Sequence, residues 1–328
     1  MTRVLITGVA GFIGFMVASR LLNEGHEVHG LDNMSNYYDA GLKQARLAKL
    51  DREHGFRPRF ADITDASSLR SIFADLEPEI VVHLAAQPGV RHSITNPHDY
   101  VTANLVGHAN VLEACRAVPP RHLLYASSSS VYGANGHQPF RETDSTDKPM
   151  SFYAATKRAN EAMSFSYSHL YGIAATGLRF FTVYGDWGRP DMAPYLFAKA
   201  ISEDSPIDIF NRGDVARDFT FGADATEAVG RLVHVIPNVE ENGLAPHRVV
   251  NIASGRKVAL SDFITALERN FGRRAIKNPV AAQSGDVQET WADISLLQRL
   301  TGFTPVTSLE EGVGRFVEWF KGYHGDSR

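Results

Sequence analysis

The sequence has 328 residues, of which 44% are hydrophobic and 21% charged, and its formal net charge is −4 at pH 7. This composition is typical of a soluble globular protein with one large or two closely packed domains, and the negative charge argues against nucleic acid or a membrane surface as a partner. The single cysteine excludes an internal disulfide, no apolar run is long enough to span a membrane, and a strand is expected almost at the N-terminus, so we expect a cytoplasmic protein.

The first predicted elements form a dinucleotide-binding turn. Residues 3–7 predict a short buried strand and residues 12–23 a helix, and Gly8, Gly11 and Gly14 lie at their junction. A glycine-rich turn here presents the N–H groups and the positive end of the helix dipole to a pyrophosphate. The spacing is G-x-x-G-x-x-G rather than the standard G-x-G-x-x-G, and taken alone it is also compatible with a simple tight turn.

The second predicted strand, residues 27–31, ends in Asp32. An acidic side chain at this point of a βαβ unit accepts hydrogen bonds from the adenine ribose hydroxyls and repels a 2′-phosphate, which favours NAD over NADP. The alternative is that Asp32 only forms a turn or a helix cap. Together with the glycine turn and the βαβ spacing, it predicts cofactor binding.

Strands and helices alternate through the first half of the chain, which predicts a Rossmann-type, doubly wound parallel sheet. The further strands are expected at 58–61, 80–85, 121–127 and 174–181, and the further helices at 40–54, 66–75, 98–118 and 152–171. Ligands of such sheets bind at the carboxyl ends of the strands. The residues expected at or just past these ends are Gly8, Asp32, Asp62, Ala85, Ser128 and Thr182.

Beyond residue 182 the elements become shorter and are interrupted by Gly and Pro. Strands or helices at 248–252, 261–271 and 308–322 predict a smaller α+β region. We therefore expect a nucleotide-binding domain at 1–181, with chain returns near 217–252, and a mainly substrate-binding domain at 182–328. No linker separates them, so the two parts should pack directly and form a cleft.

Tyr153 and Lys157 predict a general base. They lie four residues apart at the start of the 152–171 helix and so share one face. A free tyrosine has a pKa near ~10, and a lysine ammonium one turn away, together with a positive nicotinamide, lowers it. Y-x-x-x-K also occurs in helices by chance, but here a strand ending in serines precedes it. A hydroxyl of Ser128 or a neighbour could bond the same substrate oxygen.

The pairing of these two motifs resembles the extended short-chain dehydrogenase/reductase family, and the resemblance runs from residue 3 to about 322. Further matching stretches make the chain most similar to the UDP-glucuronate 4-epimerases among these enzymes; they are residues 31–39, 85–91, 179–185, 187–192 and 285–287.

The resemblance implies a tightly bound NAD that oxidises C4 of a UDP-sugar and returns the hydride to the opposite face. Tyr153, Lys157 and Ser128 would be catalytic, and Ser129 and Ser130 compete with Ser128 for its role. It also implies a homodimer, in which the helices at 98–118 and 152–171 form an intermolecular four-helix bundle.

The resemblance implies two sets of binding residues. The cofactor set is Gly8, Gly11, Phe12, Ile13, Gly14, Asp32, Asn33, Ser35, Asp62, Ile63, Leu84, Ala85, Ala86, Gln87, Asn104, Ser127, Tyr153, Lys157, Phe180 and Val183. The substrate set is Gly89, Val90, Arg91, Ser128, Ser129, Ser130, Tyr153, Thr182, Arg189, Arg217, Gln283 and Asp286. Asn104 could equally be a satisfied core asparagine. The thirteen histidines lack metal-ligand spacing, and we expect no metal.

Arg189 is the candidate for binding a substrate carboxylate, because a guanidinium fork suits a bidentate acceptor. A loop arginine that caps a carbonyl is the alternative. The intermediate would be a β-keto acid, and we hypothesise that Arg189 and Thr182 hold its carboxylate away from the angle that favours decarboxylation.

The serine tract distinguishes between related reactions. Similar 4,6-dehydratases carry Thr-Asp-Glu at this point and UDP-glucuronate decarboxylases carry a glutamate, whereas residues 128–130 contain no carboxyl group. This favours epimerisation. The alternatives are a 4-epimerase of another UDP-hexose, a UDP-glucuronate decarboxylase, or a non-catalytic dinucleotide-binding regulator, although such regulators typically lose the tyrosine or the lysine.

Overall fold

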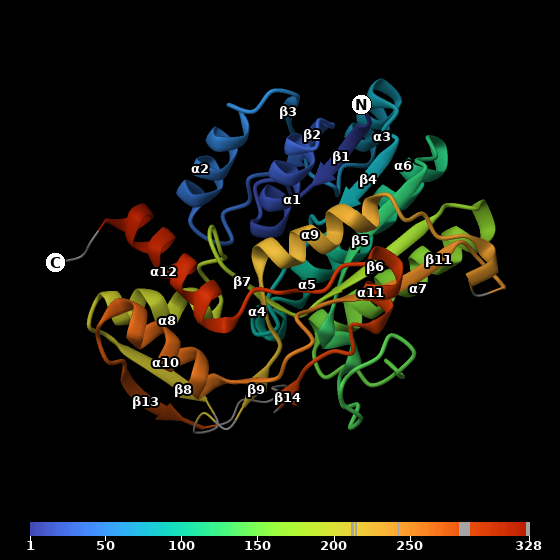
Figure 1. Ribbon diagram of the computed structural model, residues 1–328. Coiled ribbons are helices and arrows are strands. Elements are labelled where there is room, and N and C mark those ends of the chain that lie inside the picture. The colour runs from blue at the N-terminus through green and yellow to red at the C-terminus, as the bar shows by residue number, and fades with distance from the viewer. Residues whose placement is uncertain (211–212, 214, 242, 282–288, 326–328) are drawn as a thin grey trace.

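The computed structural model describes residues 1–328 except 211–212, 214, 242, 282–288 and 326–328. Its centre is a seven-stranded parallel sheet in the order β11-β6-β5-β4-β1-β2-β3 (Figure 1). The strands are β1 (Arg3–Thr7), β2 (Glu27–Asp32), β3 (Phe56–Phe60), β4 (Ile80–His83), β5 (His122–Ser128), β6 (Ala175–Phe180) and β11 (His247–Ile252). This confirms the predicted doubly wound sheet.

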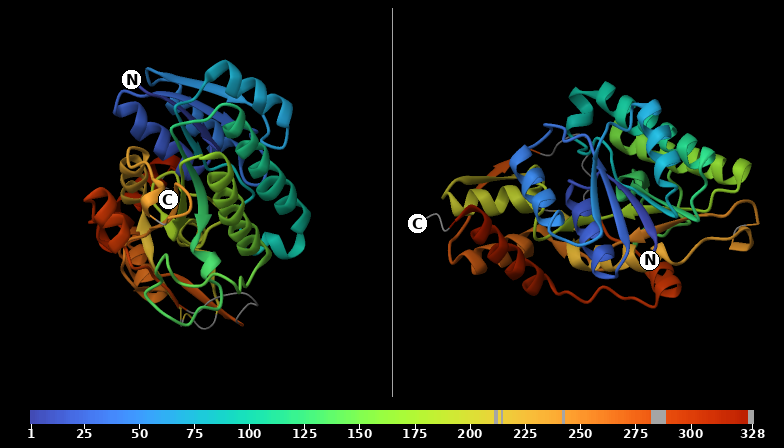
Figure 2. Two further views of the ribbon diagram at one scale, coloured as in Figure 1. Left: turned by 90° about the vertical axis from the view of Figure 1, so that its right-hand side faces the viewer. Right: turned by 90° about the horizontal axis from the view of Figure 1, so that it is seen from above.

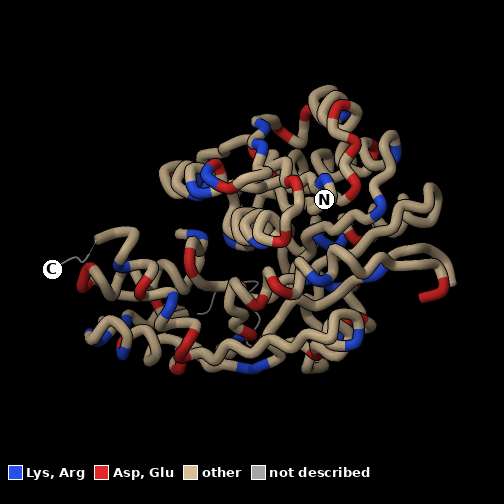
Figure 3. Tube along the Cα trace, turned by 45° about the horizontal axis from the view of Figure 1, so that its top comes forward, with Lys and Arg blue, Asp and Glu red and all other residues tan. Residues whose placement is uncertain are grey.

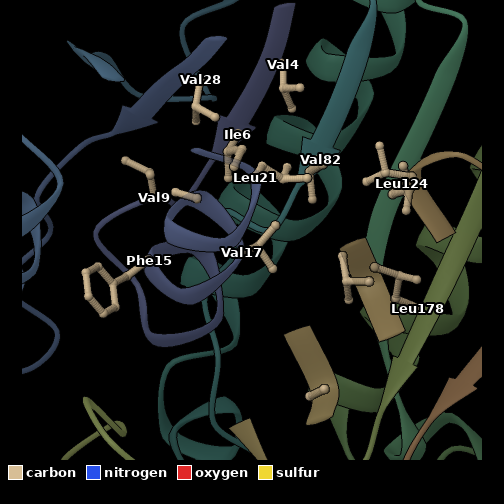
Figure 4. Packing of buried hydrophobic residues seen from close by; sticks show 14 of the residues in the cluster. Val4, Ile6, Val9, Phe15, Val17, Leu21, Val28, Val82, Leu124 and Leu178 are labelled. Atoms are coloured by element: carbon tan, nitrogen blue, oxygen red, sulfur yellow. The ribbon is translucent and has the colours of Figure 1, made fainter. Parts of the chain in front are cut away.

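The central strands are buried on both faces, because successive side chains point to opposite sides. Val4 and Ile6 of β1 face the helix α1 (Phe12–Asn23), and Figure 4 shows them against its Val17 and Leu21. Leu5, between them, belongs to the core on the other face. Each such fully buried side chain contributes about 1.5–3 kcal/mol to folding.

Helices cover both faces of the sheet (Figure 2). On the side of α1 the core includes residues of α2 (Ala40–Leu50), α9 (Gly222–Val233) and α11 (Ser295–Thr301). The opposite side carries α3 (Ala66–Leu76), α6 (Gly107–Ala117) and α7 (Phe152–Tyr171). Among the described residues, no helix is both long and apolar enough to cross a membrane.

A second region lies beyond the carboxyl ends of the strands, with its own core of aromatic and aliphatic side chains. Its helices are α8 (Ala193–Ser202), α10 (Leu260–Phe271) and α12 (Leu309–His324). Its strand pairs are β7 (Thr182–Tyr184) with β10 (Phe219–Phe221), and β8 (Pro206–Phe210) with β13 (Ile276–Val280); β9 (Ala216–Arg217) pairs with both β12 (Val258–Ala259) and β14 (Glu289–Thr290).

Two elements differ from the sequence expectation. The strand expected at 248–252 in the smaller region is β11, and it joins the main sheet beside β6, with Val250 opposite Leu178. Its apolar pattern predicts a buried strand but does not identify the partner strand. The chain return expected near 217–252 includes this strand.

The single helix expected at 98–118 is divided into three parts. These are α5 (Pro97–Tyr100), the π-helix η1 (Val101–Val106) and α6, and a short α4 (His92–Thr95) precedes them. Asn104 lies in the π-helical turn, and its side chain bonds the backbone N–H and C=O of Gln87. The π-helical turn lies where the helix bonds the segment after β4 through Asn104. A helical periodicity in the sequence does not predict such a turn.

A buried ion pair joins α7 to the sheet. Arg179 of β6 gives Nε and Nη2 to the two carboxylate oxygens of Glu161 at 2.8 and 2.9 Å, and Ser127 of β5 donates to the same carboxylate at 2.6 Å. The side chains of Arg179 and Glu161 are only 4% and 3% exposed. The pair therefore holds α7 against the ends of β5 and β6.

We predict that Glu161→Gln lowers the free energy of unfolding by about 3–5 kcal/mol, because it leaves the buried Arg179 without its counter-charge. Urea denaturation measures the change. The control is Glu310→Gln, which breaks an ion pair with Arg269 whose side chains are 56% and 67% exposed, and it should cost about 0–1 kcal/mol. Equal losses in the two variants would contradict the prediction.

Candidate active site

A cavity of about 1070 Å³ runs along the carboxyl ends of the strands and continues under the second region. It brings together nearly all the residues expected from the sequence. Those lining it are Gly8, Gly11, Phe12, Ile13, Gly14, Asp32, Asn33, Ser35, Asp62, Ile63, Leu84, Ala85, Ala86, Gln87, Gly89, Val90, Arg91, Ser127, Ser128, Ser129, Ser130, Tyr153, Lys157, Phe180, Thr182, Val183 and Arg189.

Two expected residues lie outside the cavity lining, and two more lie outside the described part of the chain. Asn104 is 1% exposed and does not line the cavity; its bonds to Gln87 and Thr156 make it a satisfied core residue that holds the segment after β4. Arg217 lies on β9, outside the cavity lining. Gln283 and Asp286 lie outside the described residues.

The glycine-rich turn can approach a ligand and its neighbours closely. Gly8 has φ +76°, and a Cβ there would lie 2.7 Å from the nitrogen of Ala85. A Cβ on Gly14 would lie 2.1 Å from the carbonyl oxygen of Gly8. These contacts show that the turn packs against its own backbone and against the segment after β4 too closely for side chains. Gly11 is the N-cap of α1, and Gly11, Phe12 and Ile13 line the cavity, so the N-terminus of the helix fits a diphosphate.

Asp32 stabilises the turn as well as lining the cavity. Its Oδ2 accepts from the N–H of Ala10 at 3.0 Å, and its Oδ1 from the N–H of Met34 at 2.8 Å. The ammonium of Lys43 lies 3.9 Å from Oδ1. A carboxylate can accept further bonds, so the turn role and ribose binding are compatible. Lys43 lines the same part of the cavity and was not anticipated from the sequence.

The start of α7 brings Tyr153 and Lys157 to the cavity. The Ser151 hydroxyl caps the helix by accepting from the N–H of Ala154 at 3.1 Å. One turn further, Lys157 Nζ donates to the carbonyl of Ala126 at 3.1 Å and lies 6.0 Å from the centre of the Tyr153 ring. Both side chains line the cavity at the end of β5.

The protonation of these groups depends on burial and on nearby charges. Burial raises the pKa of the Tyr153 phenol, while the Arg189 guanidinium and a hydrogen bond with Ser128 act in the opposite direction. Burial lowers the pKa of Lys157 to about 8. Ser128 also donates to Ser130 at 3.1 Å. Arg189 thus acts on the candidate base itself, which the sequence pattern did not indicate.

Arg189 is held by a carboxylate of its own loop. Asp191 accepts from Arg189 Nε at 3.0 Å and from Nη2 at 2.6 Å, and the Tyr37 hydroxyl donates to Asp191 at 3.2 Å. Burial lowers the pKa of Arg189, but the charge of Asp191 outweighs this and raises it. Asp191 and Tyr37 lie within the sequence stretches that match the family, although no role was assigned to them.

A second contact crosses the cavity. The guanidinium of Arg91, which follows β4, lies over the ring of Phe210 in β8 at 4.2 Å from the ring centre. Both residues line the cavity. Charges of both signs are interspersed along the chain (Figure 3), so an anionic ligand would depend on local cations such as Arg91, Lys43 and Arg189.

One group of possible metal ligands occurs among the described residues. It consists of Glu24, His26 and His234, whose ligand atoms lie within 4.8 Å of one another. None of the three lines the cavity. The group is therefore separate from the candidate site.

The chain is similar to known proteins over nearly its whole length. The model of the NAD dependent epimerase/dehydratase family matches residues 4–253. The chain is 51% identical to a probable UDP-glucuronate 4-epimerase of Rhizobium meliloti, over 97% of this chain and 96% of the relative. It is 44% identical to UDP-glucuronate 4-epimerase 4 of Arabidopsis thaliana, over 99% of this chain and 77% of the relative.

Solved structures of similar fold include the UDP-glucuronic acid 4-epimerase from Bacillus cereus in complex with UDP-glucuronic acid and NAD. It has a TM-score of 0.90 and 32% identity, and the match covers 98% of this chain and 99% of the other. The UDP-glucose 4-epimerase of Thermus thermophilus in complex with NAD has a TM-score of 0.85 and 26% identity, with coverage of 98% and 99%.

Proposed function

This chain belongs to the NAD-dependent epimerase/dehydratase family, and we propose that it interconverts UDP-glucuronate and UDP-galacturonate through a transient 4-keto sugar. The observation that carries the proposal is the meeting of Tyr153, Ser128 and Arg189 at one wall of the cavity, beside a serine tract without a carboxyl group. The relatives named above support the choice of sugar.

The cofactor is NAD, and the cavity fits it. The amides of Phe12 and Ile13 would bind the pyrophosphate, with Gly11, whose own N–H donates to the carbonyl of Gly8, lining the same turn. Asp32 would accept from the adenine ribose, and Lys157 would donate to the nicotinamide ribose. When bound, NAD supplies a hydride acceptor for C4 and a positive nicotinamide near Tyr153. The remaining cofactor residues predicted from the sequence line the same cavity, apart from Asn104, which acts through Gln87.

Tyr153 takes the proton from the C4 hydroxyl as the C4 hydrogen leaves with its electron pair, which the bound cofactor would accept. After the 4-keto sugar turns about its bond to UDP, the hydride would return to the other face of C4 and Tyr153 would give the proton back. Ser128 is the serine assigned to assist, because among the three serines it is the one that acts to lower the pKa of Tyr153. Lys157 joins the start of α7 to β5 through its hydrogen bond to the carbonyl of Ala126. The two half-reactions cancel, so no net oxidation results.

The second region binds the UDP part, so residues 1–181 with the return near 217–252 carry the cofactor and 182–328 mainly carry the substrate. Arg217, on β9 beyond the cavity lining, is assigned to the diphosphate, and Asp286 to the region of the uridine ribose. Gln283 stands where galactose-type relatives carry an arginine, so the diphosphate relies more on Arg217. Ser129, Ser130, Thr182 and the segment 89–91 surround the sugar. Arg189 binds the substrate carboxylate. Because Asp191 already accepts hydrogen bonds from Nε and Nη2, the carboxylate either accepts from Nη1 or displaces Asp191.

A second copy of the chain covers the exposed apolar surface of η1 and α7. Val101, Val106, Leu170 and Tyr171 are 36%, 47%, 63% and 45% exposed on these neighbouring helices. An apolar surface of this kind at adjacent helices is typical of a dimer interface. The buried single cysteine fits a reducing compartment, and we place the homodimer in the cytoplasm.

We predict that the purified protein converts UDP-glucuronate to its C4 epimer without added NAD, and that Tyr153→Phe reduces the rate about 10²–10⁴-fold because the general base is lost. Proton NMR of the sugar measures the products, with UDP-glucose in parallel. Tyr167→Phe, on the same helix but outside the cavity, is the control and should retain activity. Product from UDP-glucose alone, or UDP-xylose as the main product, would contradict the assignment.

We predict that Arg189→Ala weakens binding of UDP-glucuronate and increases release of CO2 and a 4-keto pentose, because the carboxylate is no longer held. Calorimetry measures the affinity, and NMR measures the fraction of decarboxylated product. The affinity should fall about tenfold, the usual cost of an ionic hydrogen bond. Unchanged affinity together with unchanged product ratio would refute this role.

We predict that the double variant Val106→Arg/Leu170→Arg is monomeric at micromolar concentration, because the charges would be buried in the interface. Light scattering measures the mass. Val306→Arg, at a residue that is 76% exposed elsewhere, should leave the dimer intact. A wild-type protein with the mass of a monomer would exclude the homodimer.

A further inference from the structure

Arg46 of α2 is fully buried and joins two distant segments of the chain. Its Nη1 donates to the carbonyl of Ala10 at 2.8 Å and to the hydroxyl of Tyr38 at 2.8 Å. Its Nη2 donates to the carbonyls of Trp187 at 2.5 Å and Gly188 at 3.2 Å. Ala10 belongs to the glycine-rich turn, while Trp187 and Gly188 immediately precede Arg189.

The acceptors of Arg46 are all neutral. Among the described residues it forms no ion pair with a carboxylate, although its side chain is 0% exposed. A buried cation without a counter-charge is costly, and four well-placed neutral oxygens offset that cost only in this geometry. A hydrophobic side chain would fill the same space at lower cost, so packing alone does not account for an arginine here.

The loop that Arg46 holds has an unusual backbone. Trp187 has φ +63°, in the left-handed region that side chains other than glycine rarely adopt. The bond from Gly188 N–H to the carbonyl of Gly185 at 3.0 Å closes this turn, and Arg46 binds the two carbonyls that point out of it. Such a conformation persists only where neighbouring groups impose it.

The segment that carries Arg46 also contacts the residues after Arg189. Tyr37, next to Tyr38, donates to Asp191, the carboxylate that pairs with Arg189. The backbone before Arg189 and the counter-ion after it are therefore both attached to residues 37–46. In contrast, Arg189 itself forms no bond with this segment among those of the described residues.

We propose that Arg46 is a positioning residue for Arg189, anchoring the 187–191 loop to the glycine-rich turn so that Arg189 meets the substrate's carboxylate. Arg46 touches neither substrate nor cofactor, since it does not line the cavity. This inference rests on the proposed role of Arg189 in binding an anionic sugar. A lysine would keep the charge but bind one point instead of two, so the fork of the arginine is essential.

The test separates positioning from stability. Arg46→Lys is compared with Arg248→Lys, another buried arginine, which bonds the Val235 carbonyl and Glu241 and does not line the cavity. For each variant, calorimetry measures the affinities for UDP-glucuronate and UDP-glucose, and thermal unfolding measures stability. Both variants should be destabilised. Only Arg46→Lys should lose preference for UDP-glucuronate over UDP-glucose, by about tenfold.

A double variant makes the inference sharper. If Arg46 acts through Arg189, Arg46→Lys/Arg189→Ala should show the same preference as Arg189→Ala alone, because the positioned group is already gone. Arg46→Lys should also increase the fraction of decarboxylated product, as Arg189→Ala does. An unchanged preference in Arg46→Lys, or a further loss in the double variant, would overturn the proposal.

A milder variant covers the case in which Arg46→Lys does not fold. Tyr38→Phe removes one acceptor of the fork and should lower the preference in the same direction, by about twofold. An unchanged preference in this folded variant would overturn the proposal. The binding readout needs no turnover, so it decides the role of Arg46 even if the wild-type protein fails to epimerise UDP-glucuronate, an outcome that would reject the proposed function instead.

Discussion

The common direction of the seven strands determines where everything else in this molecule lies. Parallel strands end at one edge of the sheet, so the glycine turn after β1, Asp32 at the end of β2, and Ser128 at the end of β5 reach the same cavity. Tyr153 and Lys157 follow from a separate helix, which the buried Glu161–Arg179 pair joins to β5 and β6. The parallel arrangement of the strands thus places the cofactor site and the candidate base in the same cavity.

The charge distribution at this edge is local. The chain is net negative, yet the cavity is lined by Lys43, Arg91, Lys157 and Arg189, each held differently. Lys157 donates to a main-chain carbonyl, Arg91 lies on an aromatic ring, and Arg189 pairs with Asp191. These arrangements leave the cations with different capacities to exchange partners when an anionic ligand binds. Exchange is easiest for Arg91, because an exposed cation over an aromatic ring is bound by only about 0.5–1 kcal/mol.

Local patterns predicted the parts of the site that depend on neighbours in sequence. The glycine turn, Asp32 and the Tyr153–Lys157 pair are of this kind, and the structure places all of them at the cavity. Contacts between distant segments were not predictable in the same way: β11 pairs with β6, Arg46 bonds the 187–188 carbonyls, and Tyr37 reaches Asp191. Asn104 shows the middle case, since its burial in a helix indicated a hydrogen-bonding role but not its partner Gln87.

The chemical type of the Arg46 acceptors determines which substitutions the positions around this arginine tolerate. Three of the four are main-chain carbonyls, which every residue type carries, so mutations at positions 10, 187 and 188 can alter side chains without removing an acceptor. The constraint on position 187 is conformational: its φ of +63° disfavours β-branched replacements. Position 188 is restricted as well, because a Cβ there would lie 2.9 Å from the carbonyl oxygen of Gly185. The loop is therefore constrained through the shape of its backbone, whereas the arginine that binds it is constrained through its side chain.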